Sequence, residues 1–184
     1  MNNINQLLLQ AQAAQGTADW QLLIQYLHEL VLEKKPKNPE IQENQAELLK
    51  LALSVLVVGD FQQRWEIVKV IQHLGAIAIP PLIEILTDEE AEEELRWYAA
   101  RLLGEFQHPD AISALVELLK TEDDEDLRAM AVSALGQMGT LAIAALTELL
   151  RDNATRLLAV RALSLIRHQQ VITPLLSVVE DTSV

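Results

Sequence analysis

The side chains that could bind a metal or carry out acid–base chemistry are four histidines and two runs of carboxylates. The histidines are far apart in the sequence: His28, His73, His108 and His168. No H-x-H or HExxH pattern occurs. The runs, DEEAEEE at 88–94 and EDDED at 122–126, lack the spacing of a calcium-binding loop. With no cysteine there is no thiolate chemistry. We therefore predict no catalytic residue, no metal site and no cofactor.

Two interpretations of the acidic runs remain open. Both runs fall between repeating segments of the sequence, so they lie at the same edge of a repeat structure. They form either a solvated acidic edge or a patch that binds a basic partner.

Charged residues also recur at intervals of about 30 residues. The acidic series is Glu84, Glu117 and Glu148, with Ser177 at the fourth position. Two parallel series are mainly basic: Arg64, Arg96, Arg128 and Arg156, and five residues later Lys69, Arg101, Ser133 and Arg161. These series either pair with one another across neighbouring repeats or form a stripe that binds a partner.

The apolar residues repeat with the same interval and predict helices. One block reads IPPLIEIL at 79–86, and its equivalents begin at Ile112, Ile143 and Ile172. Within each block the apolar residues fall at i, i+3, i+4 and i+7, which is helical periodicity. Each repeat is therefore a helix, a short turn and a second helix. One such hairpin cannot cover its own apolar face, but stacked neighbours can.

We predict an all-α right-handed superhelix of about eleven helices, in which four hairpins cover about 60–91, 92–124, 125–153 and 154–182. Residues 1–58 form a divergent N-terminal helical segment. Its three helices are separated at Gly16–Thr17 and at 34–39. This segment either caps the end of the hydrophobic core or is a separate partner-binding module that displays Trp20 and Tyr26.

The boundaries of the helices have local signals. The residues expected to cap first helices are Asp60, Asp124 and Asn153, while Thr17 or Asp19 caps the second N-terminal helix. Four glycines near the ends of first helices suit left-handed caps or close contacts between helices. They are Gly75, Gly104, Gly136 and Gly139.

Charge and composition limit the classes of partner. The net charge is −13, from 14 basic and 27 acidic residues. Nucleic acid and anionic membrane surfaces need clustered basic residues, so neither is an expected partner. The longest apolar runs are shorter than the roughly 20 residues that span a bilayer, and the N-terminus has no secretory signal pattern. We expect a soluble cytoplasmic protein whose partner has a basic face.

The segment RWYAARLLGEFQHPDAISALVELL at 96–119 resembles the HEAT-like repeat of phycobilisome lyase subunits and their relatives. Segments 125–153 and 154–182 match the pattern well, and 60–91 matches it more loosely. The resemblance implies an armadillo-type fold in which the second helices line the concave face. It also implies two functions: a protein-binding scaffold, or a bilin lyase subunit or phycobilisome-degradation factor of cyanobacterial character.

The two functions predict different uses of the same helices. A scaffold without chemistry of its own would bind its partner with the acidic stripe of Glu84, Glu117 and Glu148. A bilin would need aromatic walls and a cation for its propionates, which Trp97, Tyr98 and Arg101 supply. We favour the scaffold and predict that these six residues form the partner-binding site.

The last helix has more apolar residues than one neighbouring hairpin can cover. They are Val171, Ile172, Leu175, Leu176, Val178 and Val179. We expect part of this set to face outward, and either the natural chain continues beyond Val184 or two copies join through this end.

Overall fold

The computed structural model describes residues 3–33 and 39–181, and it is all-α. The described residues form twelve α-helices, one π-helical turn and three 3₁₀ turns, with no strand. The all-α solenoid class predicted from the repeats is confirmed. The chain divides into two compact units, Met1–Ala78 and Ile79–Val184. This division lies twenty residues beyond the boundary expected after residue 58.

The first unit contains α1 (Asn3–Gly16), α2 (Trp20–His28) and its π-helical extension η1 (Glu29–Glu33). The break expected at 34–39 falls mostly in residues 34–38, which lie outside the described residues. The next helices are α3 (Pro39–Glu43) and α4 (Gln45–Val58). The unit ends with α5 (Phe61–Leu74) and the 3₁₀ turn η2 (Gly75–Ala78). Asn44 separates α3 from α4, and this break in one expected helix accounts for twelve helices in place of eleven.

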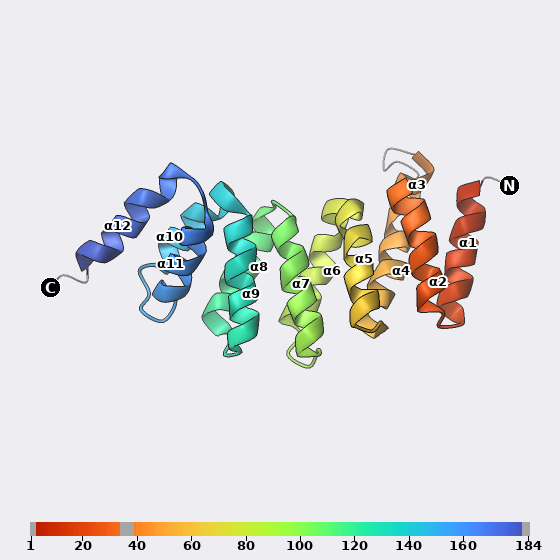
Figure 1. Cartoon of the computed structure of the whole chain (residues 1–184), viewed down its shortest axis with the longest axis horizontal. Coiled ribbons are helices and arrows are strands. Elements are labelled where there is room, and N and C mark those ends of the chain that lie inside the picture. Colours follow the sequence, from red (N-terminus) through yellow and green to blue (C-terminus); the bar gives the residue numbers. More distant parts are fainter. Residues whose placement is uncertain (1–2, 34–38, 182–184) are drawn as a thin grey trace. The chain divides into compact units, whose positions relative to one another are not determined.

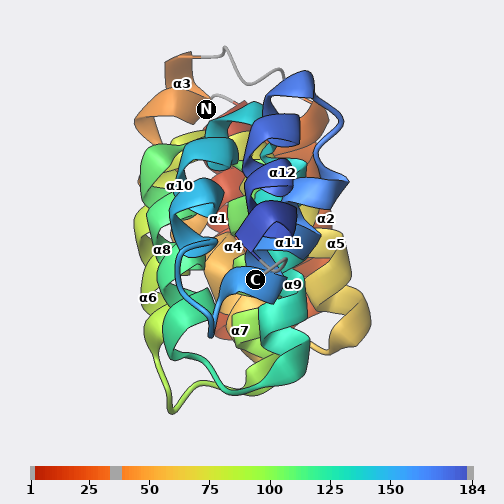
Figure 2. The ribbon, with the colours of Figure 1, turned by 90° about the vertical axis from the view of Figure 1, so that its left-hand side faces the viewer.

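The second unit contains seven helices in two rows. They are α6 (Ile79–Thr87), α7 (Glu93–Glu105), α8 (Pro109–Thr121), α9 (Glu125–Gln137), α10 (Ile143–Leu149), α11 (Arg156–Leu165) and α12 (Ile172–Asp181). The 3₁₀ turns η3 (Gly139–Ala142) and η4 (Gln169–Val171) precede α10 and α12. Helices α7, α9 and α11 pack side by side, and α8 packs against α6 and α10. Figure 2 shows α6, α8 and α10 on one side and α9 and α11 on the other. Small and branched apolar residues fill the space between the rows, among them Leu103, Leu115, Leu135 and Leu146, all fully buried.

Two of the four glycines allow the first helices to approach one another. A Cβ at Gly104 would lie 2.7 Å from the Cβ of Ala134 on α9 and 2.9 Å from its Cα. A Cβ at Gly136 would lie 2.8 Å from the Cβ of Leu165 on α11. The close contacts expected for these glycines are therefore formed between neighbouring repeats. The other two, Gly75 and Gly139, have φ values of 79° and 65°, which a glycine adopts without strain.

The helix pairs differ from the hairpins that the repeat pattern suggests. Helix α7 packs more extensively on α6, the helix before it, than on α8, the helix after it. Likewise α9 packs on α8 and α11 packs on α10. Of the two second helices adjoining it in the chain, each first helix of this unit thus packs more on the preceding one than on the following one, while its neighbouring first helices supply further contacts.

Most predicted N-caps are confirmed. Asp60 and Gln63 form a reciprocal capping box at the start of α5. Asp124 accepts from the backbone N–H of Leu127 at 2.6 Å, and Asp19, not Thr17, caps α2. The prediction for Asn153 is wrong. Helix α11 begins three residues later, after Thr155, whose hydroxyl donates to the Leu149 carbonyl oxygen at 2.9 Å.

Helix α12 differs from the other helices of its unit because none of its described side chains is buried. Three apolar side chains on one face of α12 are more than half exposed: Ile172 at 55%, Leu176 at 56% and Val179 at 64%. In Figure 1, α12 follows α11 at the C-terminal end of the unit. The expectation that part of its apolar set faces outward is confirmed.

One stretch is longer and more apolar than the sequence analysis expected. Among the described residues, Phe61–Thr87 is long and apolar enough to cross a membrane by length and composition alone. The stretch joins α5, η2 and α6, and buried core helices of soluble proteins have the same composition. It therefore carries little weight as a membrane signal.

Candidate functional site

The arginine that begins each first helix has a structural role in three of the four repeats. In unit 1, Arg64 donates from Nη2 to the Val57 carbonyl oxygen at 3.1 Å. In unit 2, Arg96 donates from Nε to the Leu86 oxygen at 3.0 Å, and Arg156 donates from Nε to the Leu150 oxygen at 2.9 Å. The last carbonyls of a helix lack partners within the helix and carry partial negative charge. Arg64, Arg96 and Arg156 therefore connect their own first helices to the end of the helix before each of them.

Arg96 has a second partner in the loop between α8 and α9. Its Nη2 forms an ion pair with Glu122, which directly follows α8. The Glu122 carboxylate also accepts from the backbone N–H groups of Asp123 at 3.0 Å and Asp124 at 3.1 Å. The Asp124 N–H is the largest cause that lowers the pKa of Glu122, and Arg96 lowers it further, while burial acts in the opposite direction. Arg96 thus connects the ends of α6 and α8 to the start of α7.

The predicted acidic stripe is exposed, but it is partly neutralised. Glu84, Glu117 and Glu148 occupy equivalent positions on α6, α8 and α10, and all three are exposed. Glu117 pairs with Lys120 at 3.1 Å, and Glu148 pairs with Arg151 at 2.7 Å. The first pair lies within α8, and the second joins α10 to Arg151 in the turn that follows it, so both are local i,i+3 pairs and not pairs across neighbouring repeats. Because two of its three carboxylates are paired with cations, the stripe attracts a basic partner less strongly than the sequence suggests.

The aromatic cluster is divided between core and surface. Tyr98 is fully buried, so the prediction that it contacts a partner is wrong. Its ring lies edge-on to Trp97, with the centroids 5.2 Å apart and an angle of 86° between the planes. Trp97 and Arg101 are half-buried on α7. Adjacent positions on a helix point about 100° apart, so one side chain can enter the core while its neighbour stays at the surface.

The structure brings Trp97 together with both acidic runs in a groove between α7 and α9. This acidic groove has a volume of about 480 Å³. Its carboxylates come from the first turns of the two helices: Glu93, Glu94, Asp124 and Asp126. Trp97, Leu127, Ala129 and Met130 supply the apolar part of the lining. The two runs and Trp97 are separate in the sequence, and only the packing of α7 beside α9 places them in one site.

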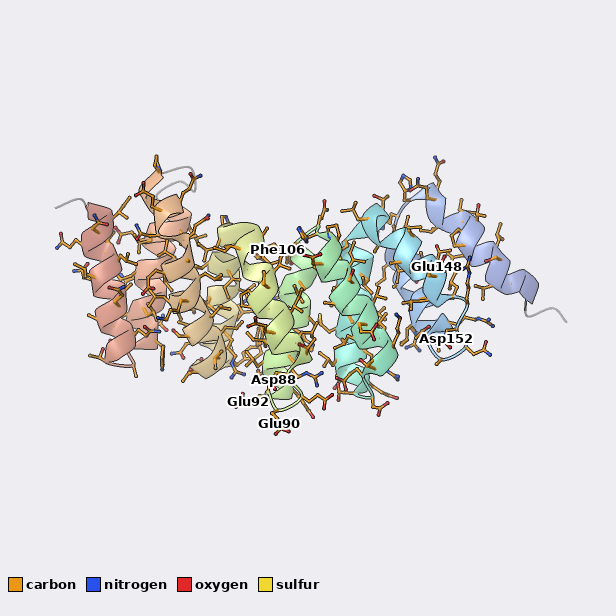
Figure 3. All side chains as sticks on the ribbon, turned by 180° about the vertical axis from the view of Figure 1, so that it is seen from behind. Asp88, Glu90, Glu92, Phe106, Glu148 and Asp152 are labelled. Carbon is orange, nitrogen blue, oxygen red and sulfur yellow. The ribbon has the colours of Figure 1, made fainter. Side chains whose placement is uncertain are left out.

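The remainder of the first run lies apart from this groove. Asp88, Glu90 and Glu92 lie on the loop between α6 and α7, as Figure 3 shows. None of the three lines the groove. The solvated-edge interpretation therefore fits the first part of the run, and the binding interpretation fits its last two residues.

The chemistry of the acidic groove suits a cation. Asp124 is occupied as the N-cap of α9, but Glu93 and Asp126 form no ion pair within the part of the chain that the structure describes. A lysine or arginine side chain there would meet carboxylates and the face or edge of an indole. A cation over the face of a tryptophan ring is worth about 0.5–2 kcal/mol, depending on its desolvation.

Two histidines have a capping role that the sequence analysis missed. His108 Nδ1 accepts from the backbone N–H of Asp110, and His168 Nδ1 accepts from that of Gln170, both at 3.2 Å. The two histidines occupy equivalent turn positions just before a helical segment, and this equivalence in the sequence could have indicated their shared capping role. Within residues 3–33 and 39–181, no group of three or more His, Asp or Glu side chains is arranged to hold a metal ion.

Comparison with known proteins agrees with this arrangement. Residues 79–157 match the family of HEAT repeats, from the start of α6 into α11. No curated protein matches the sequence. HEAT repeats generally mediate protein–protein interactions. Residues 79–157 are therefore similar in sequence to HEAT repeats, and they form the helix pairs described above.

Proposed function

We propose that this protein is a non-catalytic scaffold that binds a basic segment of a partner protein in the acidic groove between α7 and α9. The observation that carries the proposal is the placement of Trp97 among Glu93, Glu94 and Asp126. The net charge of −13 would also attract a basic partner over longer distances.

The acidic groove replaces the stripe on α6, α8 and α10 as the main binding surface of this proposal. Glu117 and Glu148 already have cationic partners, whereas the groove has at least two carboxylates without ion pairs and an aromatic wall. The stripe remains a rival site for the same kind of partner, and a charge-matched comparison separates the two.

The test uses an acetylated pentapeptide amide of alternating glycine and arginine as the probe. The double variant Glu93→Gln/Asp126→Asn removes two carboxylates from the groove. The control Glu117→Gln/Glu148→Gln removes two from the stripe. We expect the groove variant to weaken binding about tenfold, since two charge contacts of roughly 0.2–1 kcal/mol are lost. The stripe variant should change the affinity less than twofold.

Salt and spectroscopy give two further readouts. Binding should weaken as ionic strength rises, because exposed charges are screened beyond about 8 Å at physiological salt. The NMR signal of the Trp97 indole N–H should shift as peptide is added. Equal losses in both variants, or a Trp97 signal that does not move, would rule out the groove as the binding site.

The resemblance to phycobilisome lyases implies the alternative of a bilin-binding lyase subunit. The geometry supports this function less well, because Tyr98 is buried and the carboxylates beside Trp97 would repel the bilin propionates. Adding a bilin and recording its visible absorption tests the alternative. A saturable shift that is lost in Arg101→Gln would favour it.

We also propose that a second copy of the chain covers the apolar face of α12. Ile172, Leu176 and Val179 are spaced i, i+4, i+7 and are each more than half exposed. Burying such side chains is worth about 1.5–3 kcal/mol each. A two-fold dimer would place the same stripe on both sides of the interface.

A further inference from the structure

The arginine of the third repeat lacks the helix-end bond that its equivalents form. Leu86 and Leu150, which accept from Arg96 and Arg156, hold the eighth position of their repeat blocks. Leu119 holds that position before Arg128, yet the Arg128 side chain forms no hydrogen bond or ion pair within the described part of the chain. Its Nε atom is buried without a partner. A buried donor in this state has lost its hydrogen bond to water, so a ligand that accepts from it is favoured.

Arg128 also lacks the carboxylate that its equivalent has. Arg96 pairs with Glu122, which lies ten residues beyond the Ile112 that begins its block. The corresponding residue of the next block, ten beyond Ile143, is Asn153, which is neutral. The carboxylate that pairs with the arginine in one repeat, Glu122, is therefore replaced by a neutral amide in the next repeat.

Arg128 lines a second groove, between α9 and α11, with a volume of about 470 Å³. Across it on α11 lies Arg161, which is exposed and whose guanidinium has no partner among the described residues. Val132 and Leu157 form part of the wall, and Leu157 is 59% exposed. Two guanidinium groups beside apolar side chains match a carboxylate that is flanked by an apolar group.

The two grooves are neighbours on opposite sides of α9. Asp126 and Ala129 line both of them. A chain segment that crosses α9 can therefore reach the carboxylates around Trp97 on one side and the two arginines on the other. Glu125 and Asp126 line the second groove as well, so a bound carboxylate has to lie beside Arg128 and Arg161 and away from these two groups.

We infer that the α9–α11 groove binds a carboxylate of a partner protein, carried by an acidic residue next to an apolar one, with Arg128 and Arg161 as its cationic partners. The next step rests on the proposed function: this acidic residue belongs to the same bound segment whose basic residue enters the groove beside Trp97. The recognised segment is thus bipolar, with a positive part and a negative part on either side of α9.

The direct test is an NMR titration of the full chain with acetyl-leucyl-glutamate amide. The backbone signals of Val132 and Leu157 should shift with a saturable dependence on concentration. The variant Arg128→Gln/Arg161→Gln should reduce the affinity at least about fivefold, with an unchanged melting temperature, because neither side chain has a partner to lose. The control Arg167→Gln, an exposed arginine outside both grooves, should leave the affinity unchanged.

A peptide that joins both charges tests the bipolar segment. We compare the glycine–arginine pentapeptide with versions extended by one to four glycines and a leucine–glutamate pair. The best spacer should increase affinity about tenfold, and Arg128→Gln/Arg161→Gln should abolish this gain without changing the affinity of the basic peptide. A gain that survives in the variant, or no gain at any spacer length, overturns the bipolar segment.

The two proposals fail separately. If the basic peptide does not bind but the dipeptide still shifts Val132 and Leu157, the proposed function fails and the carboxylate site stands. If the dipeptide produces no saturable shift, or shifts that Arg128→Gln/Arg161→Gln leaves intact, the carboxylate site is wrong whatever the basic peptide does.

Discussion

The Arg96 guanidinium and the Glu122 carboxylate form an ion pair between the first turn of α7 and the residue after α8, with 12% and 15% of their side chains exposed. Because Arg96 also donates to the Leu86 oxygen at the end of α6, one side chain connects three consecutive helices. The acidic groove begins at this same junction, because Asp124, which comes shortly after Glu122 in the chain, lines the groove. The ion pair therefore positions one wall of the groove.

Replacing Glu122 with Gln should lower the free energy of unfolding by about 1–3 kcal/mol. The substitution keeps a hydrogen-bonding side chain but leaves a largely buried guanidinium without its counter-charge. Urea unfolding at pH 7 measures the loss. The control Glu117→Gln removes an exposed pair with Lys120 and should cost less than about 0.5 kcal/mol. Equal losses in the two variants would show that the buried pair adds nothing beyond surface charge.

The contribution of Glu122 should disappear in acid. Its pKa in the folded protein is lowered from the reference value of 4.5. A lowered pKa means that the carboxylate stabilises the fold above the unfolded-state pKa and that this stabilisation is lost as pH falls through the folded-state pKa. The difference in unfolding free energy between the native chain and Glu122→Gln should therefore be constant near neutral pH and shrink below about pH 4.5. Measurements at pH 7 and in steps down to pH 3 check this. A difference that stays constant across the range would contradict the assigned pKa direction.

Substituting Gly104 with Ala should destabilise the second unit by about 1–3 kcal/mol, because the new methyl group would overlap the backbone of Ala134. Thermal unfolding monitored by circular dichroism measures the effect. Gly16→Ala is the matched control, since a Cβ there meets no atom within 4 Å. If Gly104→Ala unfolds at the same temperature as the native chain, α7 and α9 are not as close as the structure places them.

The exposed stripe of α12 should make the protein dimeric. Sedimentation velocity of the native chain should show a concentration-dependent dimer, and Leu176→Glu should shift it to monomer, because a charge at the centre of an apolar interface is left desolvated. Ser177→Glu introduces the same charge at a residue outside the stripe and should leave the dimer intact. A native chain that sediments as a monomer at all concentrations would disprove this interface.

The sequence alone determined the class of fold. Apolar residues at i, i+3, i+4 and i+7 in blocks that recur about every 30 residues can be buried only by stacked helices, so the repeat predicts the helices and most of their ends. Local chemistry also identified the caps at Asp60 and Asp124, because a cap depends on residues within one turn. Asn153 failed as a cap because a tertiary bond, from Thr155 to the Leu149 oxygen, sets where α11 begins.

Only the tertiary structure decided what the charged residues do. Arg96 and Arg128 hold equivalent positions in the sequence, yet the Arg96 side chain connects three helices, whereas that of Arg128 lines a groove and has no partner among the described residues. Trp97 and Tyr98 are adjacent, yet one lines the acidic groove and the other is in the core. A repeat pattern gives the position of a residue within its own helix. Whether its side chain is paired, buried or free depends on the neighbouring helix, whose distance and angle are set by packing at residues such as Gly104 and Ala134.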